Sequence, residues 1–254
     1  MATPAHSFVT EHYTPRAQNY VTSLNHSTGE DLDQIELFLH GCASADLLDL
    51  GCGGGHVSYR AAPHVRSVVA CDVTPSMLEA VAHTAQERGL SNITVTEAAA
   101  EALPFADAAF SIVLCRFSAH HWPGFEAGLR EARRVLKPRG KAIFIDVIAP
   151  ADPVLDTHLQ TFELLRDPSH VRNYTLAEWT AALARAGFSL TGITPRKLPL
   201  DFPVWIARSH TSTQHADAIR SLQIASPAAV HTHFRIAPDG SFDLDTATFQ
   251  LLTA

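Results

Sequence analysis

The stretch Leu47-Leu-Asp-Leu-Gly-Cys-Gly-Gly-Gly55 decides the fold of this 254-residue chain. Asp46 to Leu50 is a short apolar run typical of a buried strand, and the glycines after it permit φ > 0 and close approach of a ligand to the backbone. Val57 to Ala62 then predicts a helix that ends near Pro63. A strand, a glycine-rich loop and a helix in this order predict the first unit of a parallel α/β sheet.

The alternation of strand and helix continues along the chain. Upstream, residues 5–40 have helical character. We expect strands at 46–50, 67–72, 92–96, 110–115, 141–148, 188–196 and 242–252, and helices at 57–62, 75–88, 125–136, 153–166 and 175–186, with an irregular helical tail over 201–235. Right-handed crossovers then predict an α/β fold that is Rossmann-like and doubly wound. Its mostly parallel, seven-stranded sheet would carry helices on both faces and a last antiparallel strand.

Composition excludes several classes of function. The formal net charge is −7 and the 19 Lys and Arg are scattered, which argues against a nucleic-acid partner. The densest basic group, residues 130–141, follows a helix into a turn and is interpreted as a solvated helix face. No apolar run approaches the roughly 20 residues of a membrane span, and the N-terminus lacks a secretory signal, so a cytoplasmic protein is expected.

Cysteine and histidine spacing predicts no metal site. The cysteines have no C-x-x-C spacing, and we interpret them as small buried residues, neither disulfides nor zinc ligands; they are Cys42, Cys52, Cys71 and Cys115. The 15 histidines include the pair His120-His121 but no H-E-x-x-H pattern.

Two aspartates sharpen the meaning of the glycine loop. Asp49, at the end of the strand, suits a cationic group such as an ammonium and would repel a pyrophosphate. His56 stands where the dinucleotide fingerprint G-x-G-x-x-G needs its third glycine. Asp72 ends the second strand, where a carboxylate either accepts hydrogen bonds from ribose hydroxyls or caps the next helix. Together they favour a nucleoside ligand with an amino group.

The chain resembles class I methyltransferases that use S-adenosylmethionine (SAM). Leu47 to Gly55 is similar to the first motif of that superfamily, and Glu101-Ala-Leu-Pro-Phe-Ala-Asp-Ala-Ala-Phe110 resembles a segment of its ubiquinone/menaquinone-biosynthesis type. Arg133-Arg-Val-Leu-Lys-Pro-Arg-Gly140 resembles the loop before its fifth strand, and Tyr13-x-x-x-Ala17-x-x-Tyr20 resembles its lid helix. The match covers roughly 8–147; the remainder resembles a less characterised bacterial subgroup.

The resemblance implies one domain over 1–254, with lid helices in 1–45, a cofactor-binding core in 46–148 and substrate-side helices and terminal strands in 149–254. It implies SAM as cofactor and S-adenosylhomocysteine as product. The implied cofactor-binding residues are Asp49, Gly51, Gly53, Gly54, Asp72, Val73, Met77, Ala100, Glu101, Cys115 and Arg116. The sequence departs from the family at Ala99, where a polar residue is usual, and at Arg139, which replaces a turn residue that prefers φ > 0.

Methyl transfer from a sulfonium needs orientation above all, and a general base only when the nucleophile must lose a proton. Among the residues after the fourth strand, His120 and His121 are the candidates for that base, because histidine titrates near neutrality; the other interpretation is that they only line the pocket. Trp122, Arg172 and Tyr174 are the candidate substrate-pocket residues, Arg172 as a partner for an acidic group. For Arg172 and Tyr174 the alternative is a loop that merely connects two helices.

The sequence therefore predicts methyl transfer to a small molecule of an aromatic or quinone-like kind, by a monomer or homodimer. Two alternatives remain: a non-catalytic SAM-binding regulator, and an NAD-dependent oxidoreductase, which His56 and Asp49 weaken. Methylation of RNA or protein is disfavoured by the acidic net charge.

Overall fold

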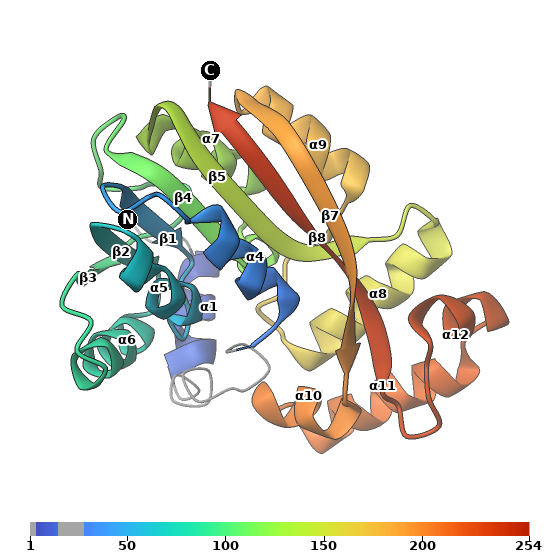
Figure 1. Ribbon diagram of the computed structural model, residues 1–254. Coiled ribbons are helices and arrows are strands. Elements are labelled where there is room, and N and C mark those ends of the chain that lie inside the picture. The colour runs from blue at the N-terminus through green and yellow to red at the C-terminus, as the bar shows by residue number, and fades with distance from the viewer. Residues whose placement is uncertain (1–3, 15–27, 254) are drawn as a thin grey trace.

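β1 (Asp46–Leu50) lies within a mixed sheet whose strand order is β3-β2-β1-β4-β5-β8-β7 (Figure 1). The computed structural model describes residues 4–14 and 28–253. The other strands are β2 (Ser67–Asp72), β3 (Ile93–Glu97), β4 (Phe110–Arg116), β5 (Leu136–Ala149), β6 (Tyr174–Thr175), β7 (Phe188–Leu200) and β8 (Phe242–Thr253). β8 runs antiparallel to β5 and β7, and the other pairs are parallel. The predicted parallel sheet with a last antiparallel strand is confirmed.

Helices cover both faces of this sheet. They are α1 (Pro4–Tyr13), α4 (Glu30–Phe38), α5 (His56–Ala61), α6 (Pro75–Glu87), α7 (Phe125–Val135), α8 (Pro153–Arg166), α9 (Leu176–Arg185), α10 (Phe202–Arg208), α11 (Thr213–Ala225) and α12 (Ala228–Phe234), with short 3₁₀ turns η2 (Ala62–His64) and η3 (Ala119–His121). Successive side chains of a strand point to opposite faces. Leu47 therefore packs with α4 and α5, whereas Leu48 packs with α7 and α9.

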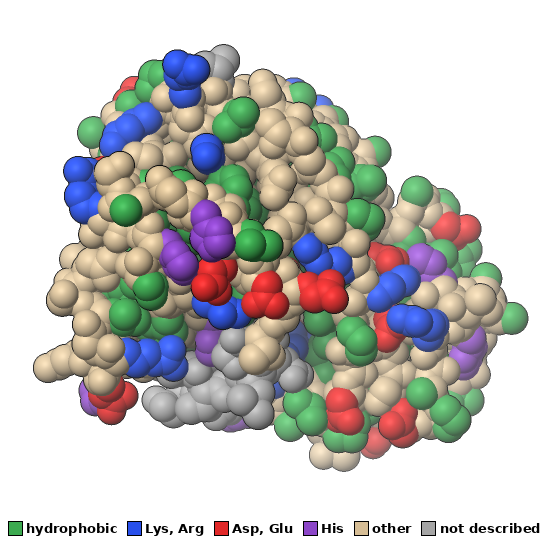
Figure 2. Space-filling view, in the orientation of Figure 1, with side chains coloured by type: hydrophobic (Ala, Val, Ile, Leu, Met, Phe, Trp, Pro, Cys, Tyr) green, Lys and Arg blue, Asp and Glu red, His purple; other side chains and the backbone are tan. Residues whose placement is uncertain are grey.

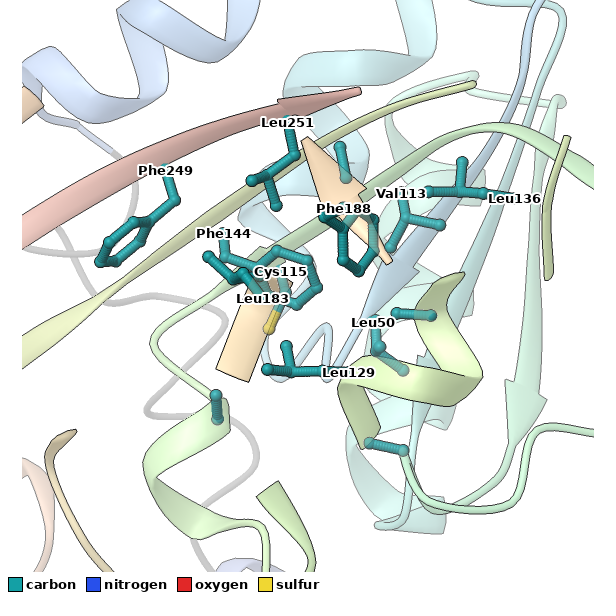
Figure 3. Close-up of a cluster of buried hydrophobic side chains, with 14 of the residues drawn as sticks. Leu50, Val113, Cys115, Leu129, Leu136, Phe144, Leu183, Phe188, Phe249 and Leu251 are labelled. Atoms are coloured by element: carbon teal, nitrogen blue, oxygen red, sulfur yellow. The ribbon is translucent and has the colours of Figure 1, made fainter. Parts of the chain in front are cut away.

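The core under α7 and α9 is the largest apolar cluster. Figure 3 shows it from within: Phe144 of β5 and Leu129 of α7 converge with Leu183 of α9 and with Phe249 of β8. Trp179 of α9, which is fully buried, stacks on Phe249 with ring centroids 4.9 Å apart. Burying aromatic rings of this size contributes a large share of the stability of the fold.

A second apolar layer forms beyond the parallel strands. β7 and β8 are long strands of 13 and 12 residues, and they run past the parallel part of the sheet toward α8 and α10–α12 (Figure 1). Phe162, Trp205, Phe234 and Phe242 form the centre of the cluster there. The C-terminal third is thus packed on the extension of two strands.

Local sequence explains where the helices of this part begin. Asp152 caps α8 by accepting the N–H groups of Val154 and Leu155, with Pro153 in the first turn. Thr175 and Glu178 form a capping box at the start of α9. These caps agree with the predicted helix starts near 153 and 175.

Three details differ from, or lie outside, the sequence prediction. β6 was not expected, because two residues carry no periodicity. β5 starts at Leu136 and includes the predicted turn 137–140, in which Arg139 adopts φ 60°, the left-handed region that its position in the motif requires. In the N-terminal region α1 and α4 are helical, as expected, whereas Ala17 and Tyr20 lie outside the described residues. Within the described ranges, no helix is long and apolar enough to cross a membrane.

Candidate active site

A cavity opens at the carboxyl ends of β1, β2 and β4. This is where a ligand is expected in a doubly wound sheet. Twelve of the residues predicted to bind cofactor or substrate line it: Asp49, Gly51, Gly53, Gly54, Asp72, Val73, Met77, Ala100, Glu101, Arg116, His121 and Trp122. The sheet thus brings together residues that are more than 70 positions apart in the sequence.

The glycine loop forms one wall of this cavity. The N–H groups of Gly51 and Cys52 both donate to the carbonyl oxygen of Cys71, which ties the loop to the end of β2. Gly51 has φ +70°, and a Cβ there would lie 1.9 Å from Oγ of Ser118. Only glycine fits this position, since a side chain would clash with Ser118 and strain the backbone.

Asp72 serves two purposes at the end of β2. Its Oδ2 accepts the N–H of Gly53 and its Oδ1 accepts the N–H of Thr74, both at 2.9 Å. Burial raises its pKa, and these hydrogen bonds act in the opposite direction. A carboxylate has about four acceptor positions, so lone pairs remain for a diol in the cavity. Both interpretations made from the sequence, helix start and ligand contact, are compatible with this geometry.

Asp49 is the deepest acid of the cavity wall. Its carboxylate is 1% exposed and accepts a hydrogen bond of 2.6 Å from Oγ of Ser58 on α5. Burial raises its pKa to about 7, and the Ser58 hydrogen bond opposes this only in part. A buried acid on the point of ionising favours a cationic ligand group, because the ligand's charge compensates the desolvation of the carboxylate.

α1 covers the side of the cavity near Met77, and sequence reasoning missed this contact. Val9 and Tyr13 of α1 pack against Met77 and Val73, and Oγ1 of Thr10 donates to the carbonyl oxygen of Val73 at 3.1 Å. The resemblance to a lid helix pointed to Tyr13, but no periodicity in the sequence indicated which face of α1 turns inward.

The side chain of His121 is held in a network at the other end of the cavity. Its Nδ1 lies 3.1 Å from the carbonyl oxygen of Ser169, and its Nε2 lies 3.1 Å from the hydroxyl of Tyr13. The Tyr13 hydroxyl donates to Asp167 at 2.6 Å. A carbonyl oxygen only accepts, so Nδ1 carries the ring proton and Nε2 presents a lone pair.

The charges around His121 set its protonation. Burial and the neighbouring His120 lower the pKa of His121 to about 4, so the ring is neutral at neutral pH. Burial raises the pKa of Asp167. The charges of His121 and Arg166 and the hydrogen bonds from Ser169 and Tyr13 outweigh burial, so the pKa of Asp167 is lowered. A neutral imidazole beside an ionised carboxylate is able to accept a proton.

Four predicted site residues do not line this cavity. Cys115 points into the core among Leu183 and Phe144 (Figure 3), because alternation along β4 turns its side chain toward α7 and α9. His120 turns away, and its Nδ1 lies 2.6 Å from Asp146.

Arg172 and Tyr174 lie outside this cavity because of local pairing. Arg172 is 39% exposed and contacts Asp156 and Glu178 at 3.4 and 3.5 Å. Tyr174 stacks on Phe125 with ring centroids 3.9 Å apart. The polar and aromatic character of this segment thus serves the connection between α8 and α9, the alternative interpretation of the sequence.

All four cysteines are free thiols, and three of them are buried. In the described part of the chain, no group of three or more His, Cys, Asp and Glu side chains is placed to hold a metal ion.

Known proteins resemble this chain in sequence and in fold. The family described as "Methyltransferase domain" matches residues 48–144. The chain is 46% identical to the uncharacterized protein YafE of Escherichia coli over 195 residues, which cover 77% of this chain and 94% of that protein. It is 35% identical to the uncharacterized methyltransferase YcgJ of Bacillus subtilis over 221 residues, 87% of each chain. The crystal structure of YcgJ superposes with a TM-score of 0.85 over 88% of this chain and 98% of that one.

The chain belongs to the class I SAM-dependent methyltransferases. It is similar to YafE and YcgJ over most of its length. Its similarity to a ubiquinone/menaquinone biosynthesis C-methyltransferase of Brucella anthropi, at 35% identity, covers only 43% of each chain. SAM is therefore its cofactor, and the fold of the core is the methyltransferase form of the Rossmann-like sheet.

Proposed function

We propose that this protein transfers the methyl group of SAM to a small molecule of an aromatic or quinone-like kind, with His121 as proton acceptor. The observation that carries the proposal is one cavity that is lined both by Asp49 and Asp72 and by His121 and Trp122.

The cofactor-binding assignments fit the residues present. The open backbone at Gly53, where a Cβ would meet no atom within 4 Å, leaves room beside the loop for the methionine part. Asp49 would hold the ammonium and Asp72 the ribose diol, while Met77, Val73, Ala100 and Glu101 would surround the adenine. Bound SAM supplies a methyl group on a positively charged sulfur. The protein orients the acceptor toward it and excludes water.

Tyr13 supports His121 as the proton acceptor. Nε2 of His121 can take the proton that an acceptor releases, and Nε2–H then donates to the hydroxyl oxygen of Tyr13, whose own proton stays on Asp167. The imidazolium then keeps Nδ1–H on the Ser169 carbonyl and lies close to ionised Asp167. The network therefore holds one more proton without breaking a hydrogen bond, as a general base requires.

Surface charge supports a small acceptor. On the face seen in Figure 2, Lys and Arg side chains are spread apart, with Asp and Glu among them, and do not gather into one basic patch. A polyanionic substrate would need such a patch.

The test has two stages. Calorimetric titration with SAM and with NADH measures the cofactor preference, and SAM is expected to bind. Incubation with methyl-labelled SAM and a metabolite extract, followed by mass spectrometry, then identifies the product. Label transfer to a small molecule supports the proposal; saturable SAM binding without transfer to any acceptor would identify a non-catalytic SAM-binding protein instead.

A further inference from the structure

A second cavity adjoins the first, to which we assign SAM and which is called the SAM cavity below, on the other side of Phe117. It lies where β7 and β8 pass α8 and α10. Its apolar wall is formed by Phe117, Val147, Leu198, Pro199, Leu200, Trp205 and Leu244. Its polar groups are Thr28, His120, Glu163, Arg166 and Arg208. Nothing in the cofactor-binding assignment uses this space.

Glu163 is the unusual residue of this second cavity. Its side chain is 6% exposed, and its carboxylate forms no hydrogen bond or ion pair with any residue in the described ranges 4–14 and 28–253. Burial raises its pKa, while the nearby positive charges of Arg166 and His120 oppose that effect. Buried polar groups are almost always hydrogen-bonded, because leaving one unpaired costs free energy. A buried carboxylate without a hydrogen-bond partner at a cavity wall indicates a ligand that donates a hydrogen bond to it.

The wall between the two cavities is thin and strained. Phe117 contributes to both, and it adopts φ +51°, a conformation that non-glycine residues rarely take. Its N–H donates to the carbonyl oxygen of Ile145 at 2.8 Å. The rings of His120 and His121, one facing each cavity, lie 4.2 Å apart. Strain of this kind persists at functional sites where the surroundings enforce it.

The charges decide which donor suits Glu163. Asp146 raises the pKa of His120 against the effect of burial, and Arg166 and Arg208 add two permanent cations. An ammonium would be repelled by these cations, whereas a neutral hydroxyl would not. The apolar wall, with Trp205 and Phe117, suits an aromatic body.

We propose that the second cavity recognises the methyl acceptor, and that the acceptor is an aromatic molecule whose hydroxyl donates to Glu163. This inference rests on the proposed function, because it assigns the acceptor of that reaction. His121 serves the reacting end at the SAM cavity, and Glu163 serves the hydroxyl at the far end.

Hydroquinone and its dimethyl ether, 1,4-dimethoxybenzene, test the assignment, because they differ only in the hydroxyl donors. Both are titrated by calorimetry into protein saturated with S-adenosylhomocysteine, which occupies the cofactor part of the first cavity. Hydroquinone is expected to bind at least about tenfold more tightly, since hydrogen bonds to a charged group contribute about that much. Benzylamine, which carries an ammonium, is expected to bind more weakly than hydroquinone.

Variants test whether Glu163 causes the difference in affinity between hydroquinone and its ether. Glu163→Met should bring the two affinities within about twofold, and Glu163→Gln, whose amide oxygen still accepts, should keep part of the preference. Glu79→Met, the same change at an exposed glutamate of α6, should keep all of it. Glu163→Gln should also be at least as stable to heat as the wild type, because the raised pKa of Glu163 disfavours its charged form.

The outcomes separate the two proposals. Equal binding of hydroquinone and its ether, no binding of hydroquinone at millimolar concentration, or a preference unchanged in Glu163→Met would overturn the acceptor assignment. Failure of SAM and S-adenosylhomocysteine to bind wild-type protein would instead overturn the proposed function.

Discussion

The two cavities on either side of Phe117 are built in different ways. The SAM cavity is lined by α1 and by residues within four short segments, 49–57, 72–77, 98–101 and 116–123, which lie at the ends of neighbouring strands. The second cavity takes side chains from residues 28, 117, 120, 147, 163, 166, 198–208 and 244. One is formed by loops and backbone, and the other by side chains that meet only after the C-terminal helices have packed.

This difference explains why the sequence indicates the methyl donor but does not indicate the acceptor. A loop between a strand and a helix has its own sequence pattern, with glycines that the backbone requires. A cavity between helices has no such pattern, since any apolar residue of suitable size forms its wall. Five predictions test this division of roles.

His121→Gln has the largest expected effect. Losing a general base lowers kcat by roughly 10²–10⁴-fold, because the amide of glutamine does not take up a proton from the acceptor. The rate is measured with the acceptor found by mass spectrometry, and SAM affinity is measured alongside. His83→Gln, at an exposed histidine of α6, is the matched control and should not change the rate. An unchanged kcat in His121→Gln would show that His121 only lines the cavity and does not act as a base.

Gly51→Ala tests the donor cavity alone. The left-handed backbone costs about 1–2 kcal/mol with a side chain, and the new Cβ would push Ser118 into the cavity. We expect SAM binding to weaken by more than about tenfold. Gly53 also has a positive φ, but a Cβ there would meet no atom within 4 Å. Gly53→Ala should therefore lose less SAM affinity than Gly51→Ala. Equal losses in the two variants, measured by calorimetry, would show that the contact with Ser118 is unimportant.

Asp49 makes SAM binding depend on pH. Its pKa of about 7 means that the ionised fraction rises roughly tenfold between pH 6 and pH 8. Only ionised Asp49 attracts the ammonium, so SAM should bind about tenfold more tightly at pH 8 than at pH 6. Asp49→Asn should bind weakly, with little dependence on pH. Similar wild-type affinities at the two pH values would contradict the assignment.

The same aspartate affects stability with a defined sign. Its folded pKa lies above its ordinary value, so the folded state holds a proton that the unfolded chain has already lost. The free energy of unfolding should therefore fall as pH rises from about 4 to about 7, and Asp49→Asn should remove that contribution. Denaturant unfolding across this range measures it.

Arg172→Ala has the smallest expected effect. The guanidinium is partly exposed and contacts Asp156 and Glu178, outside both cavities. We expect kcat/KM to change by less than about twofold and stability by about 0.5 kcal/mol or less, as for surface residues in general. A large fall in kcat/KM would show that Arg172 contributes to acceptor binding. It would also contradict the assignment of donor and acceptor to these two cavities.

Most of the fold could be predicted because its strands and helices alternate with clear periodicity. The strand ends at Asp49 and Asp72 followed from the apolar runs before them. Cys115 does not line the SAM cavity, and the sequence could not show this because it indicates the end of β4 but not the face that each side chain takes. Arg172 and Tyr174 do not line it either, and their partners, Asp156 and Phe125, lie 16 and 49 positions away. His120 and His121 were indistinguishable until η3 turned one ring toward each cavity.

The sequence by itself determined the methyl donor and the sheet. The roles that we propose for Gly51, Asp49 and Asp72 depend on backbone geometry and charge at positions that their own strands define. Only the tertiary structure decided that Tyr13 and Asp167 hold His121, and that Glu163 faces a second cavity without a partner in the described chain. The physical reason is distance along the chain: 154 residues separate Tyr13 from Asp167, and no local pattern encodes a contact that only packing creates.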